Sequence, residues 1–303
     1  MNSLFNDLKE KERQTLYIIG NGFDLHHGIP SNYMDFYRWL KTQGKDDFIK
    51  DMEIIFPKME NGKFLLWMDF ERALKDFDIE RVYKGFTKDD KNYFDETIAH
   101  QAPDSVKPTI SQITNMVNKW AKSIDISGVT KDELLMLPKE SFYLTFNYTL
   151  TLEEVYKIPL SQICHIHGNT RLGSVIVGHD DSIDEKIYQY EENQYTENSK
   201  VELARINNEF LYKNGRGNIL NHQDFFNIIK DVCRVVVLGH SLSEIDRMYF
   251  GHVIRSTQKN SHWHISKHQP SDQEQIDKFL PFQNKEEAGE YYIPPENRWI
   301  FIF

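Results

Sequence analysis

Two polar residues each close a short apolar run: Asn147 ends SFYLTFN and His167 ends ICHIH. An amide at the carboxyl end of a parallel strand opens into the crevice where α/β proteins bind ligands. A neutral imidazole at such an end could accept a proton or orient a hydroxyl group. Taken alone, Asn147 is better explained as a turn residue or a helix cap. Asn147 and His167 indicate a functional site only in combination with the other motifs of the chain.

A second histidine, His165, precedes His167 by two positions. Regular alternation along a strand would place both imidazoles on one face. Gly168 would let a ligand come close to His167. Because His165 lies deeper in the run, we expect it to be structural and His167 to be the functional residue.

The first apolar run, TLYIIG, continues into NGFDLHHGIP, which places Gly20 and Gly22 at a turn. Glycines there let the backbone approach a pyrophosphate, whose charge unpaired amide groups can meet. The signal is weak, because most G-x-G sequences are only tight turns. The next glycine, Gly28, also comes six residues after Gly22, where a dinucleotide fingerprint has three.

The late run VVVLGHSLSEID has the same form, with Gly239 and Ser241 after an apolar stretch and Ser243 as the predicted cap of a helix. An ordinary strand-to-helix connection with a serine cap would have the same sequence pattern. Thr151 and Glu154 have capping-box spacing, so we expect a second helix to begin there, with its positive end toward the same crevice.

Continuous apolar runs that alternate with helical patterns indicate a mostly parallel sheet covered on both faces. We therefore predict an α/β, Rossmann-like fold in a single domain spanning residues 1–303. Apolar residues spaced three or four apart predict a helical insertion at about 32–140. The predicted strands are residues 15–20, 141–147, 163–167, 174–178, 233–239 and 262–266. The remaining predicted helices are residues 152–157, 200–212, 224–231 and 244–255.

Composition excludes several classes of protein. Thirty-six Lys and Arg against 46 Asp and Glu give a formal net charge of −10, which disfavours nucleic acid and anionic membranes as partners. The sequence has no signal-peptide pattern and no apolar stretch of membrane-spanning length, so we expect a cytoplasmic protein without a membrane partner. Its two cysteines, Cys164 and Cys233, are expected to be buried, unpaired thiols.

In their order along the chain, these motifs resemble the AbiH family of bacterial phage-defence (abortive infection) proteins. The resemblance extends from about Thr15 to beyond Phe250. It is carried by the segments IIGNGFDLHHGIPSNYMDF, WMDFE, FNYTLTLEEVY, HIHGN and VLGHSLSEIDRMYF. More remotely, the same order is similar to the Sir2-like superfamily of NAD-consuming enzymes.

The Sir2-like resemblance implies a site. Asn147 would position the nicotinamide ribose and the attacking water, and His167 would be the catalytic histidine. The residues that would bind the dinucleotide are Gly20, Asn21, Gly22, Phe23, Asp24, Pro30, Thr149, Gly239 and Ser241.

This chain departs from the sirtuin pattern at three places. Asn21 and Asp24 replace the usual alanine and serine, and Thr149 stands where an aspartate meets the nicotinamide amide. The paired CxxC motifs of deacylases are also missing, which disfavours deacylation.

The resemblance therefore implies a glycohydrolase that takes NAD, or a related dinucleotide, as its substrate and needs no metal. It also allows a phage-derived trigger and a homo-oligomer. Two alternatives stay open: a nucleotide or ADP-ribose sensor without turnover, and a metal-dependent nuclease or phosphohydrolase. The residues available to the latter are Asp24, His26, His27, His179, Asp180 and Asp181.

Overall fold

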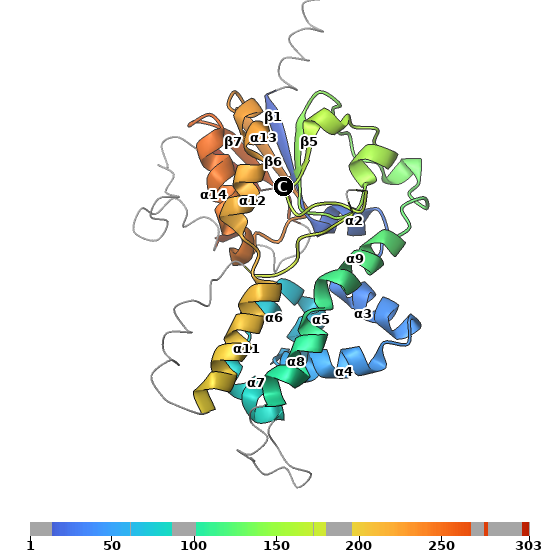
Figure 1. Ribbon diagram of the computed structural model, residues 1–303. Coiled ribbons are helices and arrows are strands. Elements are labelled where there is room, and N and C mark those ends of the chain that lie inside the picture. The colour runs from blue at the N-terminus through green and yellow to red at the C-terminus, as the bar shows by residue number, and fades with distance from the viewer. Residues whose placement is uncertain are drawn as a thin grey trace, which may run out of the picture. The chain divides into compact units, whose positions relative to one another are not determined.

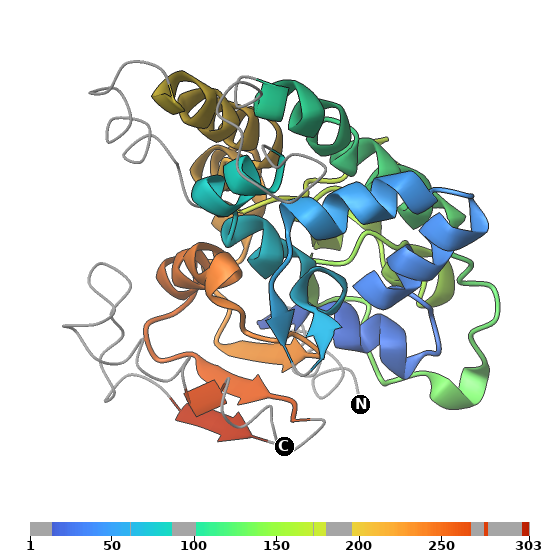
Figure 2. The same cartoon turned by 90° about the horizontal axis from the view of Figure 1, so that it is seen from below.

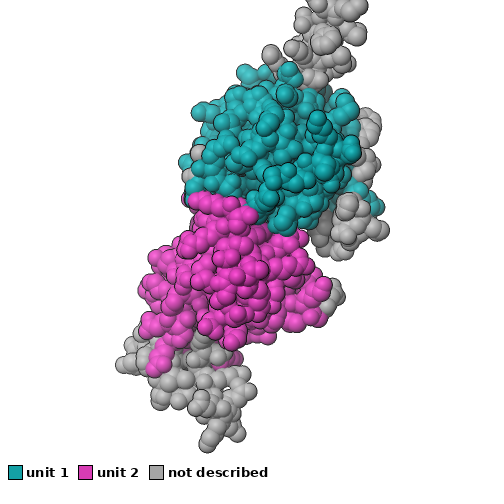
Figure 3. Space-filling view, turned by 90° about the vertical axis from the view of Figure 1, so that its right-hand side faces the viewer, with its two compact units in different colours: residues 1–31, 124–174, 215–303 teal, residues 32–123, 175–214 magenta. Residues whose placement is uncertain are grey.

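The computed structural model describes residues 14–60, 62–86, 101–171, 173–179, 196–267, 276–277 and 299–302. The chain divides into two compact units, coloured separately in Figure 3. Unit 1 combines residues 1–31, 124–174 and 215–303, and unit 2 combines residues 32–123 and 175–214. The single domain with an insertion at 32–140 stays a prediction; contacts group residues 124–140 with unit 1 and add 175–214 to the helical unit.

Unit 1 is built on a six-stranded parallel sheet in the order β5-β4-β1-β6-β7-β8. The chain fills one side of β1 with β4 and β5, then crosses to the other side for the last three strands (Figures 1 and 2). This is the strand order of Rossmann-type sheets, so the predicted fold class is confirmed. The strands are β1 (Thr15–Ile19), β4 (Phe142–Thr145), β5 (Ile163–His165), β6 (Arg234–Leu238), β7 (His262–Ile265) and β8 (Trp299–Ile302).

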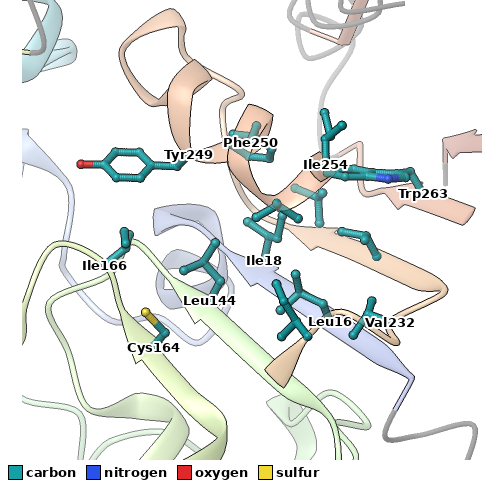
Figure 4. Packing of buried hydrophobic residues seen from close by; sticks show 14 of the residues in the cluster. Leu16, Ile18, Leu144, Cys164, Ile166, Val232, Tyr249, Phe250, Ile254 and Trp263 are labelled. Atoms are coloured by element: carbon teal, nitrogen blue, oxygen red, sulfur yellow. The ribbon is translucent and has the colours of Figure 1, made fainter. Parts of the chain in front are cut away.

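The side chains of β1 alternate between two apolar clusters, one on each face of the sheet. Leu16 and Ile18 belong to the apolar cluster shown in Figure 4, together with Phe250 and Ile254. Full burial of one such side chain stabilises the fold by about 1.5–3 kcal/mol. Residues of three helices pack in this cluster: α12 (Gly215–Asn221), α13 (Gln223–Ile228) and α14 (Arg247–Ser256).

The opposite face packs against short helical turns. Ile19 and the partly buried Tyr17 of β1 contact a cluster that includes Phe23 and Leu152. Phe23 lies on the short helix α2, and Leu152 lies on a π-helical turn, η3. The short turns of this unit are α2 (Asn21–His26), η2 (Lys131–Glu133), η3 (Thr151–Val155), η4 (Leu160–Gln162) and η5 (Glu244–Asp246).

Unit 2 is helical, as the periodicity predicts, with Phe36, Trp67, Phe70 and Trp120 at its centre. It also contains a small hairpin of β2 (Met59–Glu60) and β3 (Lys63–Phe64) that the sequence pattern missed. Its helices are α3 (Tyr33–Thr42), α4 (Asp46–Ile55), α5 (Leu65–Met68), α6 (Phe70–Lys75), α7 (Ile79–Phe86), α8 (Ala102–Ile110), α9 (Ile113–Ser123) and α11 (Thr196–Leu211).

One predicted strand is wrong: residues 174–178 do not join the sheet. They lie mostly in unit 2, where the amide of Val175 donates to Asn118 Oδ1 at 2.8 Å. His179, the next residue, makes only an isolated bridge with Tyr212. Their β-branched residues satisfy the strand pattern, but the Val175 amide is paired with a side chain rather than with a strand of the sheet.

Two further expectations concern thiols and membranes. Cys164 and Cys233 are both unpaired, as predicted; Cys164 is buried and Cys233 is half-buried. Among the described residues, no helix has the length and apolar character needed to cross a bilayer.

Candidate functional site

The candidate site lies at the carboxyl ends of the central strands of unit 1. Strand order reverses between β1 and β6, and ligands of open α/β sheets bind outside the carboxyl ends of the strands at such a switch point. The loop beginning at Gly20 follows β1, and the loop beginning at Gly239 follows β6. The two predicted glycine segments therefore flank the switch point.

These two loops pack directly on each other. The amide of Gly22 donates to the carbonyl oxygen of Gly239 at 2.7 Å, and the amide of Gly20 donates to Leu238 at 3.0 Å. A Cβ on Gly20 would lie 2.4 Å from His240 Cα, and Gly239 has a φ of +64°. The close backbone contact between the two loops is therefore enough to explain why Gly20 and Gly239 are glycines.

Asn147 reaches the same place from β4. Its Nδ2 donates to the carbonyl oxygen of Gly20 at 3.1 Å, and its own amide donates to Thr145 Oγ1 at 3.1 Å. The residue is only 8% exposed. The structure therefore brings together the amide at the end of β4 and the turn after β1.

Asp24 lies buried beside Asn147 and is held by hydroxyl groups. Its Oδ2 accepts from Thr149 Oγ1 at 2.6 Å, and its Oδ1 accepts from Thr151 Oγ1 at 3.0 Å. Burial raises the pKa of Asp24 above its ordinary value, although hydrogen bonds from both threonines, Asn147 and Ser31 act in the opposite direction. Thr149 thus serves as a donor to Asp24.

The predicted capping box at Thr151 and Glu154 is wrong. Thr151 is the first residue of the π-helical turn η3, preceded by Leu150 as its cap, and no side chain caps it. The hydroxyl of Thr151 is instead directed to Asp24. A π-helical turn is rare and often marks a functional region.

His165 and His167 do not share a face. His165 Nδ1 donates to the carbonyl oxygen of Asn147 at 3.1 Å, and its Nε2 lies 2.8 Å from Glu153 Oε1. His167 packs against other side chains, because β5 ends at His165 and a turn follows it. The alternation that would align the two imidazoles stops with the strand.

His167 is 3% exposed and lies among aromatic rings. Its ring centre is 5.1 Å from Phe146 and 5.4 Å from Tyr249. Its Nε2 is 3.7 Å from Asp246 Oδ1. Phe146 is the direct neighbour of Asn147, so His167 lies close to the end of β4 through that side chain.

Two residues that sequence reasoning missed share this region. His240 Nε2 lies 3.5 Å from Asp246 Oδ2, and the ring of His240 contacts Phe146 at 4.4 Å. The segment HSLSEID contains both residues. A histidine next to the strand-end Gly239, like His167 next to Gly168, was the available signal.

The other predicted binding residues have different surroundings. Asn21 is exposed and its Oδ1 accepts from Ser31 Oγ at 2.6 Å, while Pro30 and Ser241 are also exposed. Phe23 is 2% exposed and belongs to the apolar core. The predicted Ser243 cap is confirmed, because its side chain accepts from the Ile245 amide.

The residues available to a metal-dependent enzyme are dispersed. His27 Nδ1 donates to the Phe23 carbonyl at 2.6 Å, so its Nε2 accepts from Tyr156, also at 2.6 Å; burial lowers the pKa of His27. His26 is exposed, His179 belongs to unit 2, and Asp180 and Asp181 lie outside the described residues. Within the described part of the chain, no three His, Cys, Asp or Glu residues form a group suited to a metal ion.

Comparison with known proteins gives one family match for this chain. The model of one family, described as bacteriophage abortive infection AbiH, matches residues 16–267. Searches of curated proteins and of solved structures found no match. The matched region contains the glycine loops, Asn147, His167 and Asp246. The chain belongs to the AbiH family of bacteriophage abortive infection proteins.

Proposed function

We propose that this protein acts in phage defence by hydrolysing NAD, or a related dinucleotide, at the bond between nicotinamide and ribose. The observation that carries the proposal is the hydrogen bond from Asn147 Nδ2 to the Gly20 carbonyl at the switch point of the sheet. The Sir2-like order of motifs supports the same reaction, because it assigns a ribose-positioning role to Asn147.

The chemistry needs few groups. Nicotinamide leaves NAD as a neutral molecule and requires no general acid, so catalysis consists of stabilising an oxocarbenium-like ribose and positioning a water. The N–H groups of Asn147 are directed to Gly20 and Asp24, which leaves its Oδ1 as the atom that accepts a hydrogen bond from water or ribose.

His167 supplies the second group. We propose that its imidazole accepts a hydrogen bond or a proton from a ribose hydroxyl while Asn147 holds the water. Asp24 is 1% exposed, and its two oxygens accept from Thr149 and Thr151. Its role in this mechanism is therefore to fix Asn147 rather than to touch the dinucleotide.

A product assay tests the proposal. Purified protein is incubated with NAD, and nicotinamide and ADP-ribose are separated and quantified for the wild type, Asn147→Ala and His167→Ala. We expect turnover to fall by about 10²-fold or more in each variant. Asn221→Ala and His26→Ala replace exposed residues of the same types and should retain activity. Equal product from all five proteins would contradict the assignment.

If the enzyme needs a trigger from the phage, the same variants can be tested in infected cells. Bacteria expressing each protein are infected with a phage to which the wild type gives protection, and total NAD is followed. We expect NAD to fall with the wild type and both control variants, but not with Asn147→Ala or His167→Ala. Protection by the wild type without any loss of NAD would exclude NAD as the substrate in defence.

One observation favours a second candidate, a dinucleotide sensor without turnover. Thr149 stands where sirtuins place the aspartate for the nicotinamide amide, and its hydroxyl donates to Asp24. Calorimetry with NAD and with ADP-ribose separates the two functions. Tight binding of NAD that is recovered intact supports the sensor, and cleavage excludes it.

A further inference from the structure

We propose that Asp246 is a positioning residue that orients the imidazoles of both His167 and His240, so that the two histidines share one carboxylate at the site. The inference extends the proposed hydrolase: His167 keeps its place in the reaction, and Asp246 and His240 determine which of its nitrogens is basic.

The carboxylate of Asp246 does not cap the helix that it precedes. Asp246 is the N-cap residue of the ten-residue helix α14, where an aspartate normally accepts from the amides of the first turn. Here it makes no side-chain cap hydrogen bond and is 7% exposed. Its two oxygens face Nε2 of His167 at 3.7 Å and Nε2 of His240 at 3.5 Å.

The protonation of His240 follows from its backbone contact. Its Nδ1 accepts a hydrogen bond from the amide of Leu242 at 2.9 Å, so the hydrogen of the imidazole is on Nε2, the atom that faces Asp246. Leu242 has a φ of 53°, which is unfavourable for a residue with a Cβ. Such strain persists where surrounding contacts enforce it.

Phe146 fixes the two rings relative to each other. It makes edge contacts with His167 at 5.1 Å and with His240 at 4.4 Å. The side chains of both histidines are 4% exposed. Neither ring lies in open solvent, and each has its Nε2 within 4 Å of the carboxylate.

The consequence concerns His167. A carboxylate near Nε2 favours the tautomer that carries hydrogen on that nitrogen, which leaves the lone pair on Nδ1. Nδ1 is then the atom that takes the proton from a ribose hydroxyl. Asp246 stabilises the resulting imidazolium, as the aspartate does in serine protease triads.

The first test reads the tautomers in the wild-type protein. Long-range ¹H–¹⁵N spectra of protein labelled with ¹⁵N-histidine are recorded, with signals assigned from His167→Gln and His240→Gln. We expect hydrogen on Nε2 of both residues. An unprotonated Nε2 at either histidine overturns the inference, and this result needs neither activity nor a folded Asp246 variant.

The second test uses Asp246→Asn, which keeps the shape and removes the charge. We expect the share of His167 with hydrogen on Nε2 to fall and kcat for NAD to drop by about 10- to 100-fold, with KM changed far less. The control is Asp69→Asn, because Asp69 caps α6 by accepting from the Arg72 amide and asparagine caps equally well. Unchanged His167 spectra in Asp246→Asn overturn the inference. Altered spectra, together with phage protection by the wild type that leaves NAD unchanged in infected cells, would retain the positioning and reject the hydrolase.

Discussion

Asn147 and Gly20 are 127 residues apart in sequence, yet the side-chain amide of one donates to the backbone carbonyl of the other at 3.1 Å. The bond connects the ends of two neighbouring strands, β4 and β1. It fixes the rotamer of Asn147 and adds a second donor to a carbonyl group that also accepts from the Phe23 amide at 3.0 Å.

Replacement of Asn147 by leucine should therefore lower stability as well as activity. The Gly20 carbonyl keeps its second donor, the Phe23 amide, so the variant loses one hydrogen bond, and we expect the free energy of unfolding to fall by about 0.5–1.5 kcal/mol. Urea denaturation measures it, with the exposed Asn221→Leu as the control. A variant as stable as the wild type would show that the Phe23 amide alone satisfies the carbonyl of Gly20.

The contribution of the Thr149 hydroxyl to stability can be separated from that of its methyl group with two variants. Thr149→Val is expected to lose about 1–3 kcal/mol of stability, because the buried Asp24 carboxylate loses its 2.6 Å donor. Thr149→Ser retains the hydroxyl and should lose clearly less. Equal losses in the two variants would assign the effect to packing of the methyl group.

The pKa of Asp24 predicts the pH dependence of stability. Burial raises this pKa above its ordinary 3.8, so the native state keeps a proton that the unfolded state has already lost. The contribution of Asp24 is therefore fully present below pH 3.8 and is lost as pH rises through the folded pKa. Because asparagine does not titrate, the stability of Asp24→Asn relative to the wild type should increase from about pH 4 to pH 7.

Asp125→Asn is the matched control for this pH series. A hydrogen bond from the Ser127 amide lowers the pKa of Asp125, so its contribution is present above pH 3.8 and is lost only at lower pH. Its stability relative to the wild type should stay constant from pH 4.5 to 7.5. A similarly flat profile for Asp24→Asn would mean that the hydrogen bonds outweigh burial.

The contact between Glu153 and His165 predicts a graded loss. The pair is buried, with its nitrogen and oxygen 2.8 Å apart, and His165 also donates to the carbonyl of Asn147. Removing one member of a buried pair costs about 3–5 kcal/mol, which we expect for Glu153→Ala in urea denaturation. In Glu153→Gln the side-chain amide can donate to His165 Nε2, so this variant should lose less. The opposite order would contradict the contact.

The packing of the two glycine loops can be tested at Gly20. A methyl group there would lie 2.6 Å from the carbonyl oxygen of Gly239, so both loops must shift in Gly20→Ala. We expect a loss of about 1–3 kcal/mol or more in thermal or urea unfolding. Gly128→Ala is the control, since nothing lies within 4 Å of its Cβ position. Similar stability of the two variants would show that the loops separate at little cost.

The sequence predicted the chemistry at strand ends better than it predicted the neighbours of each residue. Asn147, Gly20 and Gly239 were expected at one edge of the sheet, because parallel strands present their carboxyl ends together. His240 and Asp246 were missed, since nothing local marks an N-cap aspartate whose side chain turns away from its helix. Likewise, the pattern of residues 174–178 is that of a strand, and only its contacts in unit 2 reveal otherwise.

The sequence by itself determined the family, the α/β class and the alternation of β1 between two buried faces, because each depends on local residue order and periodicity. Only the tertiary structure decided which polar groups meet. The turn after β5 separated His167 from His165, and the π-helical turn brought Thr151 to Asp24. Hydrogen bonds form between groups distant along the chain, and their directions depend on turns of a few residues that periodicity does not encode.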